Sequence, residues 1–137
     1  MPSGYSGTPL AKKLGIKSGH RFLLCNEPSD YFSLFNDFPD DAIRLNLIKN
    51  NTADFIHLFC ITEEELFNSV NLFKPALKKS GMLWISWPKG SSKIKSELKR
   101  EPIRDFLISM GLVDIKVAAI DEDWSGLKFV YRLKDRT

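Results

Sequence analysis

The chain has 137 residues, of which 43% are hydrophobic and 27% are charged, so it is long enough for one domain with a substantial core. Its 20 lysines and arginines exceed its 17 aspartates and glutamates by a net charge of +3, too little to require a nucleic-acid or anionic-membrane partner. Two cysteines without a CxxC motif do not make a disulfide framework, and no apolar run approaches the roughly 20 residues of a membrane span. We therefore expect one cytoplasmic domain over residues 1–137 that opens with an arm over residues 1–8.

The first half of the chain predicts short elements separated by turns. A helix is expected over residues 9–14, where a proline suits the first turn and Gly15 ends the last one. Residues 21–25 read RFLLC and predict a short buried strand, and the aromatic residues of 31–38 favour a short helix. Residues 42–48 alternate and predict a strand near a sheet edge. Its direction stays open, because the connection after it is short for a parallel crossover.

The middle of the chain gives the clearest signal. Thr62 and Glu65 form a capping box at the start of an amphipathic helix expected over residues 62–77. Gly81 suits a left-handed turn after that helix. Residues 82–87 are apolar without alternation, which indicates a strand buried on both faces, as in parallel sheets.

The remaining segments complete an alternating pattern. They are a buried strand over 55–61, a basic amphipathic helix over 89–100, a helix over 102–110, and strands over 113–120 and 127–133. Strands that alternate with helices and end in a hairpin predict a single three-layer, Rossmann-like α/β domain with a mostly parallel sheet. Any ligand crevice is then expected at the carboxyl ends of the parallel strands.

Five stretches carry a resemblance to known families. Residues 53–56 (ADFI) and 77–81 (LKKSG) resemble the later half of a class I S-adenosylmethionine-dependent methyltransferase. Residues 4–16 (GYSGTPLAKKLGI), 86–89 (SWPK) and 124–128 (WSGLK) resemble a bacterial family known only as a domain of unknown function. Together they imply a degenerate methyltransferase-like fold and no known activity.

The chain departs from the methyltransferase pattern where that family holds its cofactor. Residues 25–30 (CNEPSD) contain none of the glycines that allow close backbone approach after the first strand. Residues 48–50 (IKN) lack the carboxylate that such enzymes use to bind ribose. We therefore expect no cofactor, and these residues argue against S-adenosylmethionine and against dinucleotides.

Candidate site residues lie where the strands are expected to end. Glu27 and Asp121 are candidate acid or base groups, and Trp87 with Lys89 could hold an anionic or planar ligand. Trp87 could instead be packed at the sheet end, Lys89 and Asp121 could be solvated and Cys60 could be a core thiol. Glu27 has no obvious structural role. No metal site is predicted, since the two histidines show no ligand spacing. The ligand-binding candidates are Asn26, Cys60, Trp87, Lys89 and Trp124.

Three functions remain open on the sequence alone. The first is a small intracellular domain that has lost cofactor binding and binds an unidentified small molecule or protein partner, with no membrane association. The second is an enzyme, in that case a transferase, that uses the strand-tip crevice. The third is a weak nucleic-acid binder that uses the basic stretch over residues 89–104, although that stretch lacks stacking aromatic residues.

Overall fold

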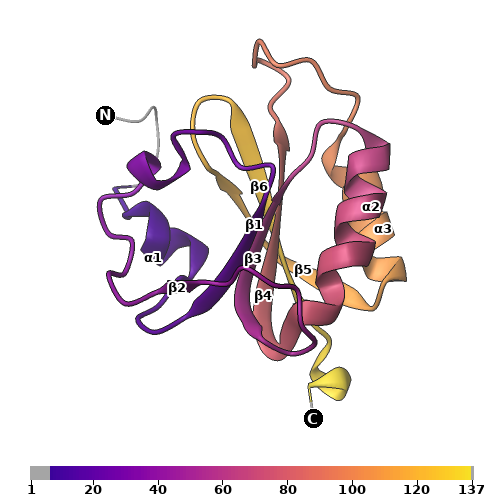
Figure 1. Cartoon of the computed structure of the whole chain (residues 1–137). Helices are drawn as coiled ribbons and strands as arrows, with labels where there is room; N and C mark the ends of the chain where they lie inside the picture. The colour runs from indigo at the N-terminus through magenta and orange to yellow at the C-terminus, as the bar shows by residue number, and fades with distance from the viewer. Residues whose placement is uncertain (1–6, 137) are drawn as a thin grey trace.

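The structure is a computed structural model that describes residues 7–136, and it contains one six-stranded sheet with helices on both faces (Figure 1). The arm predicted over residues 1–8 and the start of the GYSGTP stretch lie largely outside the described residues. The strands are β1 (Arg21–Cys25), β2 (Ile43–Arg44), β3 (Ala53–Phe59), β4 (Leu77–Pro88), β5 (Leu112–Ala119) and β6 (Trp124–Tyr131). The helices are α1 (Leu10–Leu14), α2 (Glu63–Phe73) and α3 (Arg100–Ser109), with short 3-10 turns at Tyr31–Leu34, Lys74–Ala76 and Leu133–Asp135.

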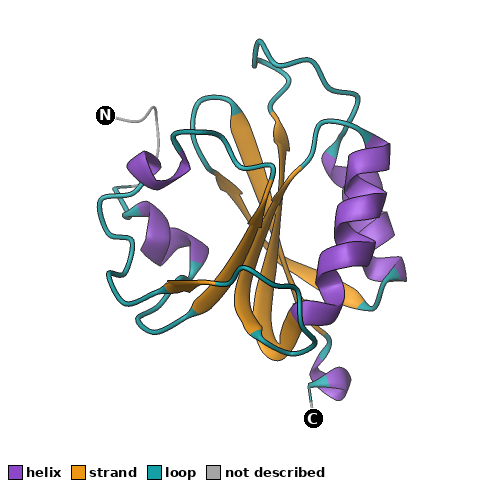
Figure 2. Ribbon diagram, viewed as in Figure 1, coloured by secondary structure: helices purple, strands orange, loops and turns teal. Residues whose placement is uncertain are grey.

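The strand order is β2-β1-β3-β4-β6-β5. Strands β2, β1, β3 and β4 run parallel, and β6 is antiparallel to both of its neighbours. Figure 2 shows α2 and α3 on one face of the sheet and α1 on the other. The predicted three-layer α/β domain with a terminal antiparallel hairpin is therefore confirmed. No helix among residues 7–136 is long and apolar enough to cross a bilayer.

Two apolar clusters hold the three layers together. Under α2 and α3, residues such as Val70 and Leu107 pack with Ile56 and Leu83 of the sheet. On the opposite face the cluster is largely aromatic and takes in α1 through Leu14. Because both faces of the central strands are buried, residues 55–59 of β3 and 82–87 of β4 are mostly apolar without alternation, as the sequence indicated.

The junction between α2 and β4 differs from the prediction. The helix ends at Phe73, and β4 begins at Leu77 rather than at residue 82. In the register with β3, Ala53 pairs with Leu77 while Phe55 pairs with Met82, so residues 78–81 bulge from the ladder. Gly81 makes no left-handed turn there. A Cβ at Gly81 would lie 3.0 Å from the carbonyl oxygens of Ala53 and Asp54, so the close approach of β3 is what requires glycine.

The basic helix predicted over residues 89–100 is absent, and an extended loop over residues 89–99 takes its place (Figure 1). Two serine hydroxyls in the loop accept hydrogen bonds from the amides two residues later, Ser92 from Ile94 and Ser96 from Leu98, both at 3.0 Å. These local bonds satisfy amides that a helix would pair with carbonyls, so they favour the extended conformation.

Both edges of the sheet are irregular. Strand β2 has only two residues and runs parallel to β1, so its direction is settled, and residues 45–52 carry the chain from β2 to β3 on the far side of β1. On the other edge, Asp114 pairs with Phe129 and Lys116 pairs with Lys128, so Ile115 forms a β-bulge.

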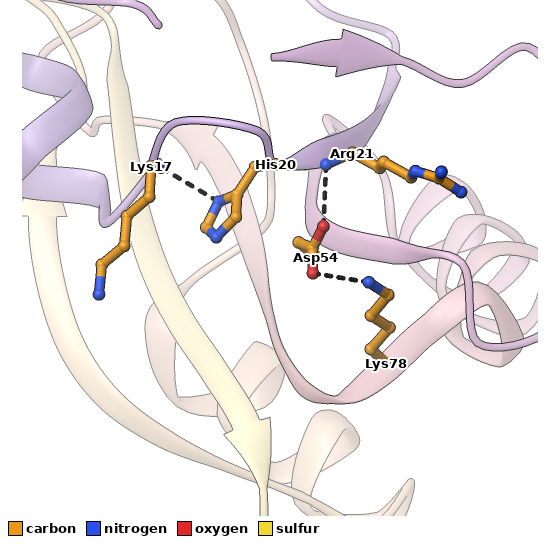
Figure 3. Close-up of polar contacts among 5 residues, drawn as sticks. All are labelled: Lys17, His20, Arg21, Asp54 and Lys78. Atoms are coloured by element: carbon orange, nitrogen blue, oxygen red, sulfur yellow. Dashed lines mark hydrogen bonds and ion pairs between the residues drawn. The ribbon is translucent and has the colours of Figure 1, made fainter. Parts of the chain in front are cut away.

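Asp54 joins three strands at the amino edge of the sheet (Figure 3). Its carboxylate accepts a hydrogen bond from the Arg21 amide at 2.9 Å and forms an ion pair with Lys78 at 3.0 Å. Burial raises the pKa of Asp54, but the bonds from Arg21 and Lys78 outweigh it, so the pKa lies below its ordinary value. The aspartate of the ADFI stretch therefore has a structural role, which is to join three strands.

A chain of polar side chains crosses the aromatic side of the core. The Tyr31 hydroxyl lies 3.0 Å from Nδ1 of His57, and Nε2 of His57 lies 2.7 Å from the Ser86 hydroxyl. His57 and Ser86 are fully buried and Tyr31 is almost so. A neutral imidazole offers one donor and one acceptor, which the two hydroxyls match. Burial lowers the pKa of His57 to about 3, so the ring stays neutral at physiological pH.

Replacing Asp54 should weaken the amino edge of the sheet. We expect Asp54→Asn to lower the free energy of unfolding by about 1–2 kcal/mol, because the charged acceptor of two bonds is lost. Urea denaturation measures this change. Asp40→Asn serves as the control, since Asp40 is exposed in a loop, and it should stay within about 0.5 kcal/mol of the parent. Equal losses in the two variants would contradict the role of Asp54.

His57 should make stability depend on pH. Its ordinary pKa of 6.5 applies in the unfolded chain, which therefore binds a proton below about pH 6.5, while the folded chain does so only near 3. The free energy of unfolding should have its full value above about pH 6.5. Between pH 6.5 and 3 it should fall as the pH falls, by up to about 1.4 kcal/mol per pH unit. Denaturant unfolding between pH 7 and 4 measures the slope. The non-titrating His57→Gln variant should show a shallower slope, and identical slopes would rule out this origin.

Candidate functional site

The sheet has a topological switch between β1 and β3. From β1 the chain goes outward to β2 and then returns to the other side of β1 to form β3. In open α/β sheets such a point leaves a crevice outside the carboxyl ends of the two diverging strands. The residues that follow these strands, Asn26 and Glu27 after β1 and Cys60 after β3, were all candidates on sequence. The structure places all three at this edge.

Asn26 adopts a left-handed backbone directly after β1, with φ of 58°. Asparagine tolerates this conformation better than other residues with a Cβ, because its short polar side chain can bond locally. The sequence prediction reserved this backbone for glycine, so it overlooked Asn26 as the residue that turns the chain away from the strand tip.

Glu27 is held by an arginine that the sequence did not single out. Its Oε2 lies 2.7 Å from a guanidinium nitrogen of Arg44 at the end of β2, and 22% of the Glu27 side chain remains exposed. The pair links the tips of β1 and β2. It leaves a partly accessible carboxylate beside the left-handed turn, in a position to accept hydrogen bonds from a ligand.

The two cysteines form the floor of this edge on the α2 side. The Cys25 thiol lies 3.8 Å from the Ser69 hydroxyl of α2. Burial raises the pKa of Cys25 and raises that of Cys60 to about 12, so Cys60 is a neutral thiol and not a nucleophile at physiological pH. Cys60 is fully buried, and its role is packing.

The start of α2 closes the β3 side of the crevice. The capping box is present: Glu65 donates its amide to the Thr62 hydroxyl at 3.1 Å, and its carboxylate accepts from the Thr62 amide at 3.3 Å. The same carboxylate oxygen accepts from the Ile61 amide at 2.7 Å. Thr62 and Glu65 are therefore engaged in capping, as the sequence predicted.

A second hollow lies at the tip of β4. Trp87, Lys89 and the loop over residues 89–99 line a cavity of about 250 Å³ with the first residue of α3. The Lys89 amide donates to the Asp123 carbonyl at 2.8 Å, which fixes the start of the loop against the hairpin. Trp87 and Lys89, the aromatic and cationic residues expected at this tip, therefore both line this open hollow.

Trp124 and Asp121 do not complete that cavity. Trp124 packs edge-on against Phe59, with ring centroids 5.0 Å apart, in the aromatic cluster, whereas Trp87 belongs to the cluster under α2. The two indoles thus lie on opposite faces of the sheet. The Asp121 carboxylate accepts from the amides of Asp123 and Trp124 at 2.8 and 2.9 Å, so it shapes the hairpin turn. Among residues 7–136 no three side chains are grouped so as to bind a metal ion.

Comparison with known proteins identifies the fold. No family model and no curated protein matches the sequence. A putative type 11 methyltransferase from Sulfolobus solfataricus superposes with a TM-score of 0.64 at 15% identity, over 92% of this chain and 91% of its own. A SAM-dependent methyltransferase from Aquifex aeolicus gives 0.61 at 17%, over 86% and 85%. A complex of DhpI with SAH (S-adenosylhomocysteine) gives 0.59 at 6%, over 91% and 83%. The chain therefore has a methyltransferase-like, Rossmann-like fold.

The expectation against S-adenosylmethionine is corrected by these neighbours. The solved proteins that share this sheet include S-adenosylmethionine-dependent methyltransferases, and one was solved with the demethylated product of that cofactor. The prediction was wrong for a physical reason: it required glycine after β1, while Asn26 supplies the left-handed backbone at that point. The prediction also required a carboxylate at the tip of β2. The structure has a carboxylate near that tip from another segment, because Glu27, which follows β1, forms an ion pair with Arg44 of β2.

Cys60 should resist alkylation while the fold persists. In a Cys25→Ser background, where Cys60 is the only thiol, we expect iodoacetamide at pH 8 to react about a thousandfold more slowly with the native protein than with the unfolded one. The reason is the smaller thiolate fraction that a pKa of about 12 allows. Mass spectrometry of timed samples measures the rate. Labelling of native protein at the unfolded rate would show an accessible thiol instead.

Proposed function

We propose that the chain is a ligand-binding domain that takes S-adenosylmethionine or S-adenosylhomocysteine in the crevice between the tips of β1 and β3. The observation that carries the proposal is the left-handed Asn26 at the topological switch point. A backbone in this conformation curves away from the strand axis, so a ligand can approach the main chain that follows β1.

The chemistry of the surrounding groups supports this ligand. Both compounds carry a ribose with two hydroxyl donors, and the partly exposed Glu27 carboxylate has acceptor capacity beyond its bond to Arg44. Leu45, half-buried after β2, adds apolar surface of the kind that an adenine ring needs. S-adenosylmethionine also carries a positively charged sulfonium group, which a carboxylate beside the crevice would stabilise.

Binding should depend on the backbone of Asn26 rather than on its side chain. We expect Asn26→Gly to bind S-adenosylhomocysteine within about threefold of the parent, because glycine adopts the same backbone at lower cost. Asn26→Val should lose affinity by at least about tenfold, since a β-branched residue strongly disfavours this conformation. Isothermal titration calorimetry measures both affinities.

Asn51 provides a matched control. It also has φ of 58° and is exposed, but it precedes β3 and so lies at the opposite, amino edge of the sheet. Asn51→Val should carry a similar cost in stability and leave the affinity unchanged. Ligand at about 100 times its dissociation constant should stabilise the parent by about 2.7 kcal/mol, or several degrees in Tm. Absence of binding by the folded parent protein, or equal losses from the two valine variants, would refute the proposal.

A further inference from the structure

Two lysines face each other across the last two strands of the sheet. Lys116 of β5 is the direct partner of Lys128 of β6 in the antiparallel register. Like charges in this position repel each other and destabilise a sheet. A third lysine, Lys17 in the turn between α1 and β1, adds its charge to the pair. Folding therefore brings three cations together from distant parts of the chain, and we call Lys17, Lys116 and Lys128 the lysine cluster.

The ammonium group of Lys128 lies over the backbone at Gly15. A Cβ on Gly15 would be 3.1 Å from Lys128 Nζ and 3.1 Å from the thioether sulfur of Met82. The Lys128 side chain is half-buried, and it donates no hydrogen bond to the part of the chain that the structure describes. No side-chain nitrogen among residues 7–136 is both buried and unbonded, so the Lys128 nitrogen must reach solvent. A small molecule can therefore approach it.

No ion pair neutralises the lysine cluster within residues 7–136. None of its three members is paired with a carboxylate. The Lys116 ammonium donates to the Lys13 carbonyl at 2.8 Å, and this acceptor carries no net charge. Lys116 thus has a structural role at the end of α1, which holds its charge in place, whereas Lys128 has no such bond.

These surroundings favour the neutral form of the Lys128 amine. Burial lowers the pKa of Lys128 the most, and the charges of Lys116 and Lys17 lower it further. Lys13 of α1 directs its own ammonium to the Ala119 carbonyl at 3.0 Å. A lysine that is desolvated and lies beside other cations is an activated nucleophile, because more of it is unprotonated near neutral pH.

We propose that Lys128 is a modification site that takes an acyl group from a small anionic donor, an acyl phosphate. Lys116 and Lys17 place positive charge beside the amine, which attracts the phosphate group of the donor. The amine attacks the carbonyl carbon, an N–C bond forms, and the bond from that carbon to the phosphate oxygen breaks. Phosphate leaves with the electron pair, and the amine proton passes to water. The product is a neutral amide, so the repulsion within the lysine cluster is relieved.

This site is separate from the proposed ligand crevice. Strands β3 and β4 lie between β1 and β6 in the sheet. Modification of Lys128 therefore does not depend on binding of S-adenosylmethionine.

Acetylation by acetyl phosphate tests the proposal. We expect the native chain at about pH 7.5 to be acetylated at Lys128 at least about fivefold faster than at Lys93. Lys93 is exposed in the loop over residues 89–99 and serves as the internal control. Mass spectrometry of chymotryptic peptides from timed samples measures both rates. In urea, which disperses the lysine cluster, the two rates should agree within about twofold.

Two substitutions of the exposed Lys116 test the role of its charge. Lys116→Gln removes the charge and should slow acetylation of Lys128 by about threefold or more. Lys116→Arg keeps the charge and should leave that rate within about twofold of the parent. The rate at Lys93 should be the same in all three proteins, and circular dichroism confirms that the variants fold.

The contrary outcomes are distinct. A rate at Lys128 equal to or below that at Lys93 in the native chain would overturn the proposal, the lower rate by showing a shielded amine. An unchanged Lys128 rate in Lys116→Gln would overturn it as well. The uncharged donor N-acetoxysuccinimide should show a smaller preference for Lys128 than acetyl phosphate does. An equal preference with both donors would overturn the assignment of an anionic donor.

Discussion

The hydrogen-bonded chain of Tyr31, His57 and Ser86 is the constraint that places the segment after β1 against the sheet. It lies within the core and joins the segment after β1, which has almost no regular secondary structure, to the two central strands. Each of these polar groups would be costly to bury alone, so they are tolerated only as a satisfied set. Because Asn26 and Glu27 begin the segment that Tyr31 anchors, these buried bonds hold the exit of β1 against the central strands.

The sequence predicted elements well where local chemistry and burial agreed. Residues 21–25 form the strand expected, and Thr62 with Glu65 caps the helix expected. The loop over residues 89–99 was mistaken for a helix because Ile94 and Leu98 are four residues apart, a spacing that fits both a helical face and strict alternation. The same two serine hydroxyls that accept bonds within this loop also donate to distant segments, to Asp123 and to the Ile61 carbonyl, and local spacing does not reveal those partners.

The candidate site was harder to predict because its geometry depends on register and on backbone angles. Trp87 and Trp124 share an edge of the sheet but lie on opposite faces, and only the pairing of Trp87 with Ser125 reveals this. Arg44 becomes the partner of Glu27 only once β2 is known to lie beside β1 in parallel. The absence of glycine after β1 did not exclude a left-handed backbone there, because Asn26 adopts a φ of 58°.

The irregular edges of the sheet have a consequence for self-association. Strand β5 exposes Ile115 and Val117, the kind of apolar side chains that promote aggregation when a flat edge pairs with a second molecule. The bulge at Ile115 interrupts that edge, and the neighbouring Lys116 ammonium is fastened to the Lys13 carbonyl at 2.8 Å. Strand β2 ends the other side after two residues. Neither edge offers a regular template, so the sheet is protected against growth into filaments.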